Sequence, residues 1–242
     1  NTFAPFDNEL VRQAFAQAID RQRIVDNFYP TGSEVASHFT PCSIPNGCAG
    51  EAWYDFNVDA AKALLEQAGY GASNPFPTVK LSYRNVVRGY LPDPVIVAQD
   101  IQAQLKENLG VTVEIVEMES GAFLDAANSG QLDGMHLLGW GADFPDVVNF
   151  LDAHFSAAAF NQFGTPFDDI TDNLTKGGQL AAEADREPFY AAANNAIKTH
   201  VPMIPVAHGG SAIAFKAAVE GFAIRSEEHT SELQSLMQLV CR

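Results

Sequence analysis

The spacing of apolar residues changes along the chain and divides it into predicted helices and strands. In "DNELVRQAFAQAID", residues 7–20, apolar side chains recur at Val11, Phe15 and Ile19, which is the spacing of one helical face. The same period, with capping residues and Gly or Pro stops, predicts helices at residues 21–29, 57–71, 93–110, 120–130, 145–155, 166–176 and 184–201. The expected N-cap residues are Asp7, Asp20, Asn57 and Ser120.

Shorter apolar or alternating runs predict strands at residues 78–84, 111–119, 134–140, 203–209 and 212–219. The first two flank the predicted helix 93–110, so they form a βαβ unit with a right-handed crossover and parallel strands. Between Pro30 and Phe56, Pro, Gly and Cys residues indicate a loop. The simplest architecture that accommodates these predicted elements is α/β, with a mixed sheet flanked by helices on both faces.

The stretch "GWGADFPDVVNFL", residues 139–151, begins where the predicted strand 134–140 ends. In open α/β sheets, ligands are taken up beyond the carboxyl ends of the strands, so this position favours a binding role. A second interpretation stays open, because Asp143 could cap the following helix while Trp140 belongs to the core.

Composition and charge exclude some partners. The chain has 242 residues, 47% of them hydrophobic, which is enough for one large domain or two small ones. A formal charge of −16 repels nucleic acid and anionic membrane surfaces. The chain opens with "NTFAPFDNEL", without an initiator Met or an apolar signal region. We therefore interpret it as a fragment whose export signal lies upstream.

The last residues look foreign to the rest of the chain. "RSEEHTSELQS" is similar to the translation of a widely used sequencing-adapter oligonucleotide. We therefore interpret residues 225–242 as a non-native tail, leave them out of the predicted fold, and expect the natural C-terminus to be missing.

Two cysteines, Cys42 and Cys48, are separated by five residues that include a Pro-Asn-Gly turn. This spacing favours a local disulfide, which is typical of exported proteins. Two alternatives stay open: a metal site that adds His38, and a pair of buried thiols. Four other histidines do not form a metal-binding motif such as HExxH, so we predict no metal site from them. They are His136, His154, His200 and His208.

Four stretches, in order, resemble the C-terminal half of family 5 extracellular solute-binding proteins, the peptide- and nickel-binding receptors of ABC importers. They are "PFDNELVRQAFAQAIDRQRIVDN", "AAKALLEQAGY", "GWGADFPDVVNFL" and "HVPMIPVAHG". The resemblance covers residues 1–224 and implies a class II periplasmic-binding-protein-like lobe, with the other lobe absent. It also implies a periplasmic or extracellular location, with lipid anchoring through the missing N-terminus.

The resemblance implies roles for particular residues. In peptide-binding relatives, the aspartate matching Asp143 pairs with the ligand's α-amino group, and Trp140 and Gly141 would wall the pocket. The pattern "RGYLPDP" matches an arginine that grips the ligand carboxylate, here Arg88, followed by Tyr90. The alternative for Arg88 is an ion pair on the surface.

The predicted function is a monomeric, non-enzymatic binding lobe that delivers a small peptide or another amine-bearing solute to an ABC permease, without a cofactor. The segment before Trp140 lacks the arginines of oligopeptide binders, so an oligosaccharide or a metal chelate stays open as the ligand. The rival class is a hydrolase with Asp143 and Asp146 as paired carboxylates.

Overall fold

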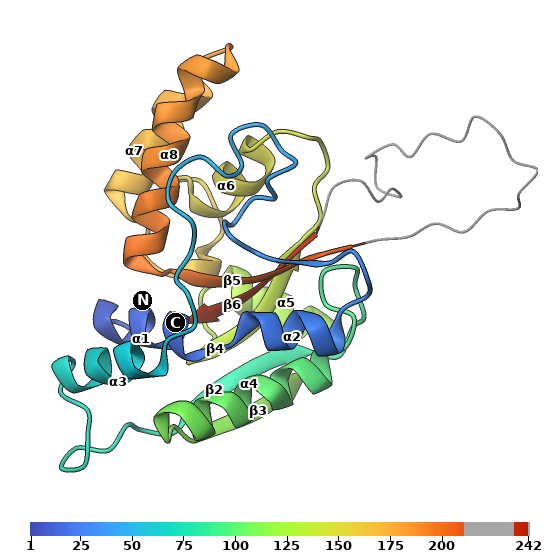
Figure 1. Ribbon diagram of the computed structural model, residues 1–242. Helices are drawn as coiled ribbons and strands as arrows, with labels where there is room; N and C mark the ends of the chain where they lie inside the picture. Colours follow the sequence, from blue (N-terminus) through green and yellow to red (C-terminus); the bar gives the residue numbers. More distant parts are fainter. Residues whose placement is uncertain (211–234, 242) are drawn as a thin grey trace, which may run out of the picture.

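The computed structural model describes residues 1–210 and 235–241, and it confirms the α/β class (Figure 1). Its helices are α1 Glu9–Ala18, α2 Arg21–Phe28, α3 Val58–Gln67, α4 Pro94–Leu109, α5 Ser120–Asn128, α6 Val148–Phe155, η1 Asn161–Phe163, α7 Asp168–Gly178 and α8 Glu183–His200. Its strands are β1 Glu34–Val35, β2 Val79–Arg84, β3 Val113–Met118, β4 Met135–Trp140, β5 Met203–Gly209 and β6 Ser235–Cys241.

One mixed sheet joins all of these strands in the order β1-β5-β6-β4-β2-β3. Strands β2 and β3 are parallel neighbours in register from Val79 opposite Val113, as the βαβ unit predicts. Strand β4 runs parallel to β2 on the other side, and β6 runs antiparallel to both β4 and β5. The carboxyl ends of β2 and β4 therefore meet at one edge of the sheet.

Helices cover both faces of the sheet, which confirms the predicted layers. In β4, Met135 and Leu137 belong to the main hydrophobic core, which also contains Ile101 of α4. Leu138 points to the opposite face, where it joins a smaller cluster with Phe123 of α5. Alternation along one strand thus separates the α4 side from the α5 side.

Two helix caps differ from the sequence prediction. The N-cap of α1 is Asn8, whose side chain accepts from Leu10 N at 2.9 Å, rather than Asp7. The N-cap of α5 is Glu119, which accepts from Ala122 N, while Ser120 is the first helical residue. Either member of such a polar pair can cap, and only the backbone direction selects one. The predicted caps Asp20 and Asn57 are confirmed.

Two buried arginines bind the first helices to the rest of the molecule. Arg12 Nε donates to the carbonyl of His200 at the end of α8, at 2.7 Å. Arg21 donates to the carbonyls of Ala36 and Pro205, which ties the loop after β1 to β5. Because buried guanidinium groups require several acceptors, these residues cross-link elements that are distant in sequence.

Helices α7 and α8 lie side by side at one end of the sheet (Figure 1). Among residues 1–210 and 235–241, no helix has both the length and the apolar composition needed to cross a bilayer.

Part of the expected tail lies within the sheet. Leaving residues 225–242 out of the predicted fold missed β6, which pairs with β4 and β5. Gln238 of β6 is buried, and its two amide atoms have no hydrogen-bond partner. A buried unpaired amide is costly, and a central strand normally carries an apolar side chain there. The non-native tail stays a prediction, with residues 225–234 and 242, like the expected strand 212–219, outside the described residues.

Candidate ligand-binding site

A pocket of about 530 Å³ opens at the carboxyl ends of β2 and β4, on the α5 side of the sheet. Its wall includes four of the residues that the sequence singled out, namely Tyr90, Trp140, Gly141 and Asp143. Side chains from α5, α6 and the segment around η1 complete it. Its position agrees with the rule that open α/β sheets take up ligands beyond their strand ends.

Asn149 of α6 holds the loop that carries Trp140 and Asp143. Its Oδ1 accepts from Trp140 Nε1 at 3.1 Å and from Asp143 N at 2.9 Å, and its Nδ2 donates to Asp143 Oδ2 at 3.3 Å. Asn149 is buried, so these bonds are partly shielded from water. One amide therefore sets the positions of both predicted site residues. The sequence pattern did not single out Asn149, although this residue lies within the quoted motif.

The structure excludes one of the two interpretations of Asp143, namely that it caps the following helix. The acceptor for the first turn of α6 is Asp146, whose Oδ1 accepts from Val148 N at 2.9 Å. Asp143 is exposed on the pocket wall, and one of its oxygens accepts from Asn149. Asp143 therefore presents a negative charge to the pocket and does not cap the helix.

Trp140 is half-buried and packs edge-on against the ring of His154, with the ring centroids 4.9 Å apart. His154 lies on α6 with Nδ1 2.7 Å from the carbonyl of Phe150. Burial lowers the pKa of His154 to about 4, so the imidazole behind Trp140 is neutral at pH 7. The side of Trp140 that packs against this neutral ring is therefore shielded from water.

Asp146 is bound to Arg186 of α8 through two bonds of 2.8 Å. The hydrogen bonds from Arg186 hold the pKa of Asp146 below its usual range. A carboxylate fixed in this way is a poor proton donor at neutral pH. The arrangement therefore gives no support to the hydrolase in which Asp143 and Asp146 act as an acid–base pair.

The cation at the pocket wall is Arg84 rather than Arg88. Arg84 ends β2, and its guanidinium donates to Ser120 Oγ at 3.0 Å and to Tyr90 Oη at 3.2 Å. Among the described residues, no carboxylate lies within ion-pair distance of Arg84. A signal was present in the sequence, since strand alternation places Arg84 opposite the core residue Tyr83.

Arg88 is exposed in a tight turn that is closed by paired backbone bonds with Leu91. Its Nη1 donates to the carbonyl of Val87 at 3.1 Å, and it does not line the pocket described above. The role of Arg88 in carboxylate binding stays a prediction. The turn lies against Gly209 of β5, where an added Cβ would collide with the Gly89 carbonyl.

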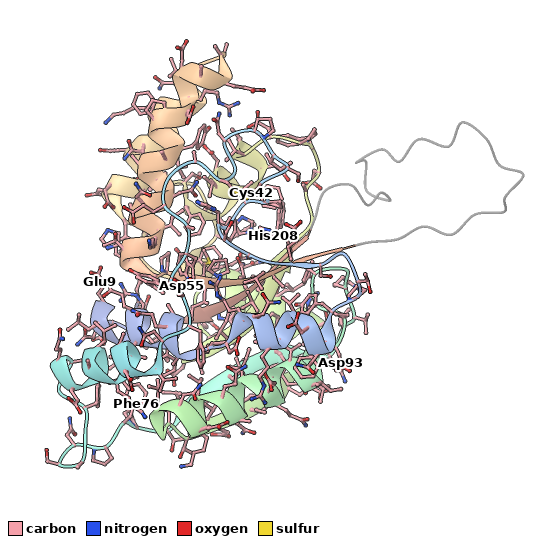
Figure 2. All side chains as sticks on the ribbon, in the orientation of Figure 1. Glu9, Cys42, Asp55, Phe76, Asp93 and His208 are labelled. Carbon is pink, nitrogen blue, oxygen red and sulfur yellow. A yellow bond between two sulfur atoms is a disulfide. The ribbon has the colours of Figure 1, made fainter. Side chains whose placement is uncertain are left out.

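The predicted disulfide is present, because Cys42 and Cys48 are bonded through their sulfur atoms in the loop after β1. Figure 2 shows Cys42 near His208 of β5. The bond closes a short loop that packs on α8, where Asn194 Nδ2 donates to the carbonyls of Gly47 and Ala49. The alternative of two separate buried thiols is therefore wrong for this form of the chain.

Residues 1–162 match the family model described as bacterial extracellular solute-binding proteins, family 5 Middle. The chain belongs to family 5 of the bacterial extracellular solute-binding proteins. This confirms the resemblance that was carried by the four quoted stretches.

Individual family 5 relatives differ in their ligands. The chain is 30% identical to a dipeptide-binding protein of Pseudomonas aeruginosa over 228 residues, which is 92% of this chain and 42% of the relative. It is 29% identical to heme-binding protein A of Haemophilus influenzae, over 90% of this chain and 40% of the relative. Family membership therefore does not by itself decide the ligand.

A solved structure supports the fold. The dipeptide-binding protein of a Pseudoalteromonas species, in complex with Met-Leu, superposes with a TM-score of 0.79 at 27% identity. The match covers 99% of this chain and 42% of that protein. The chain thus spans about two fifths of the length of the relatives that it matches, and its fold is that of periplasmic binding proteins.

Proposed function

We propose that the chain is one lobe, residues 1–224, of a two-lobed receptor that binds a small peptide or another amine-bearing solute and delivers it to the permease of an ABC importer. Two features support the lobe assignment: the share of each relative that is matched, and a pocket open at the sheet edge. In such a receptor, the ligand draws the lobes together by contacting both of them.

One observation carries the proposed ligand class: a negative and a positive side chain line the same pocket. Asp143 offers a fixed carboxylate to an ammonium group, and Arg84 with Tyr90 offers donors to a carboxylate. A zwitterion such as a short peptide satisfies both charges. A neutral oligosaccharide would leave both of them without an ionic partner, so the charges favour the peptide.

We also infer the compartment, the membrane anchoring and the oligomeric state of the receptor. A disulfide suits an oxidising environment outside the cytoplasm, and the oligopeptide-binding relative from Escherichia coli is described as periplasmic. We place the receptor at the outer side of the cell membrane, as a lipid-anchored monomer without catalytic activity.

We expect Asp143→Asn to weaken the binding of peptides with a free amino terminus at least tenfold, because the ammonium loses its ionic partner. The measurement is calorimetry on the full-length receptor against a set of dipeptides. Asp133→Asn removes the same charge from an exposed position outside the pocket and should leave the affinity unchanged. Equal affinities of wild type and Asp143→Asn for free and N-acetylated peptides would reject the ammonium role.

Arg84→Gln should weaken peptides with a free carboxyl terminus about tenfold and should spare C-amidated peptides. Arg88→Gln makes the same change at an exposed residue outside the pocket wall, so it is the matched comparison. The same calorimetric titrations give both affinities. If Arg88→Gln causes the selective loss and Arg84→Gln does not, the sequence-based role of Arg88 is correct and that of Arg84 is rejected.

A further inference from the structure

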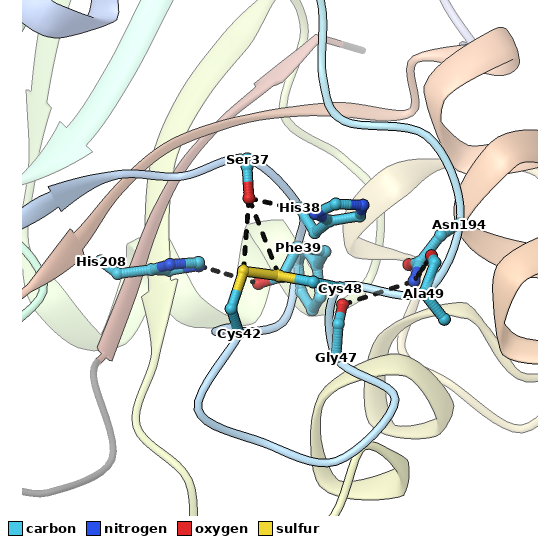
Figure 3. Close-up of a disulfide and its surroundings, with 9 residues drawn as sticks. All are labelled: Ser37, His38, Phe39, Cys42, Gly47, Cys48, Ala49, Asn194 and His208. Carbon is cyan, nitrogen blue, oxygen red and sulfur yellow. Dashed lines mark hydrogen bonds between the residues drawn. A yellow bond between two sulfur atoms is a disulfide. The ribbon is translucent and has the colours of Figure 1, made fainter. Parts of the chain in front are cut away.

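A histidine lies beside the disulfide. His38 is buried, and its ring and the two sulfur atoms of Cys42 and Cys48 offer ligand atoms that all lie within 4.8 Å of one another. Ser37 Oγ lies between them, 3.1 Å from His38 Nδ1, 3.5 Å from Cys42 Sγ and 3.7 Å from Cys48 Sγ (Figure 3). Once the disulfide is reduced, these groups are one imidazole and two thiols, and thiophilic divalent cations prefer imidazole and thiolate ligands.

Backbone bonds hold this loop in shape independently of the disulfide. Ile44 N donates to the carbonyl of Pro41 at 3.1 Å, and Gly47 N donates to the carbonyl of Ile44 at 2.8 Å. Ile44 is buried, and Asn194 of α8 donates to two carbonyls of the loop. The two thiols of the unoxidised loop are therefore held close together, which lowers the entropy cost of binding one ion.

The histidine lies within reach of the sulfur atoms, and the site is accessible. The ring of His38 is buried beside Cys42 and Cys48 and can offer a nitrogen lone pair to a cation. Cys42 is exposed, which gives an ion a path to the cluster. The hydroxyl of Ser37 can donate to a metal-bound thiolate, as second-sphere groups do in metal sites.

We propose that the thiol form of the chain, before Cys42 and Cys48 are oxidised, binds a thiophilic divalent cation of the Zn²⁺ type through both cysteines and His38. Two S–H bonds break, two metal–sulfur bonds form, and two protons pass to solvent, without any change of oxidation state. Disulfide formation instead removes two electrons from the same sulfurs and gives them to an external disulfide. The cation and the oxidant thus compete for one pair of atoms.

The site has three protein ligands, so the fourth tetrahedral position is left to water or another small donor. In a tetrahedral zinc site with metal–sulfur bonds of about 2.3 Å, the sulfurs lie roughly 3.8 Å apart. Reduction of the disulfide and a small separation of Cys42 from Cys48 would meet this requirement. Binding to newly exported chains would delay closure of the loop until the cation is removed.

The test uses the 242-residue chain with Cys241→Ser, so that Cys42 and Cys48 are its only thiols. After anaerobic reduction, Co²⁺ should bind at one equivalent and give thiolate-to-cobalt charge-transfer bands together with the visible bands of a tetrahedral site. Zn²⁺ should remove these bands by displacement. The oxidised form of the same protein is the matched control and should show none of them. Absence of the bands in the reduced form overturns the proposal.

The histidine is tested separately. His38→Gln should weaken Co²⁺ and Zn²⁺ binding at least tenfold. His208→Gln, at a nearby histidine whose Nε2 lies 3.5 Å from the carbonyl of Phe39, should leave binding within about twofold. Equal affinity of wild type and His38→Gln, or an equal loss in both variants, overturns the assigned ligand set.

A second readout is the rate of oxidation. One equivalent of Zn²⁺ should slow formation of the Cys42–Cys48 bond by oxidised glutathione at least tenfold, as followed by mass spectrometry of alkylated thiols. An unchanged rate contradicts the proposal. If circular dichroism shows that the reduced chain is unfolded, addition of Zn²⁺ must restore the native spectrum, because metal binding then supplies folding energy. Failure to restore the spectrum also overturns the proposal.

Discussion

Asn149→Ala is expected to lower the free energy of unfolding by about 2–3 kcal/mol. The buried amide accepts from Trp140 Nε1 and Asp143 N, and it donates to Asp143 Oδ2. Alanine removes three hydrogen bonds and leaves two N–H groups without their acceptor, and unpaired donors cost more than the net value of the bonds. Urea-induced unfolding followed by tryptophan fluorescence measures the change.

The same substitution should weaken ligand binding by the full-length receptor at least tenfold, because Asp143 and Trp140 lose their fixed positions. Asn173→Ala is the matched control, since the Asn173 amide donates to the Asp169 carbonyl of its own helix, α7. Alanine favours helices, so the control should change stability by less than about 0.5 kcal/mol. Wild-type stability and affinity in Asn149→Ala would show that another contact holds the loop.

The second large effect is a loss of stability in acid that depends on His154. Burial lowers the pKa of His154 from 6.5 to about 4, and the pKa of His208 to about 4 as well. Between pH 6.5 and pH 4 the unfolded chain therefore binds protons that the folded chain does not bind. Stability is fully present above pH 6.5 and falls as the pH falls. For His154 alone, the expected loss by pH 5 is about 2 kcal/mol.

Asp152 acts in the opposite direction. Burial raises its pKa from 3.8 to about 6, so the folded chain takes up this proton first and gains stability as the pH falls below 6. His154→Phe keeps an aromatic ring against Trp140 but removes the titrating imidazole. It should therefore flatten the loss of stability between pH 7 and pH 5. Asp152→Asn should make the loss steeper.

Urea titrations at each pH measure these slopes, and they stop at pH 5 because the chain has a pI of about 4.5, where low net charge promotes association. Identical slopes for wild type and His154→Phe would mean that His154 does not carry the acid sensitivity. A flatter slope for Asp152→Asn would contradict the raised pKa of Asp152.

Much of the fold follows from local patterns. The helix caps Asp20 and Asn57, the stop at Gly110 and the parallel pairing of β2 with β3 were all predicted and are confirmed. These features depend on residues a few positions apart or on the handedness of a single crossover. The placement of Trp140 and Asp143 at a strand end depends on the same local reasoning, which is why the pocket could be located before the structure.

What the sequence did not reveal concerns contacts between distant parts of the chain. The motif pointed to Arg88, whose role stays a prediction, whereas the pocket wall contains Arg84, which is held by Ser120 and Tyr90. Strand β6 was missed because its sequence was set aside, and a central strand is recognised by its neighbours, β4 and β5. Partner selection of this kind depends on tertiary packing, which spacing along the chain does not reveal.

By itself, the sequence determined the α/β class, indicated the family and favoured the pairing of Cys42 with Cys48, because periodicity, motif order and a short loop are properties of the chain. The tertiary structure decided that Asp146 supports α6 while Asp143 faces the pocket, because Arg186 of α8 binds the first and Asn149 positions the second. Two carboxylates three positions apart have the same chemistry. Their roles differ because the fold brings a guanidinium to one and leaves the other open to a ligand.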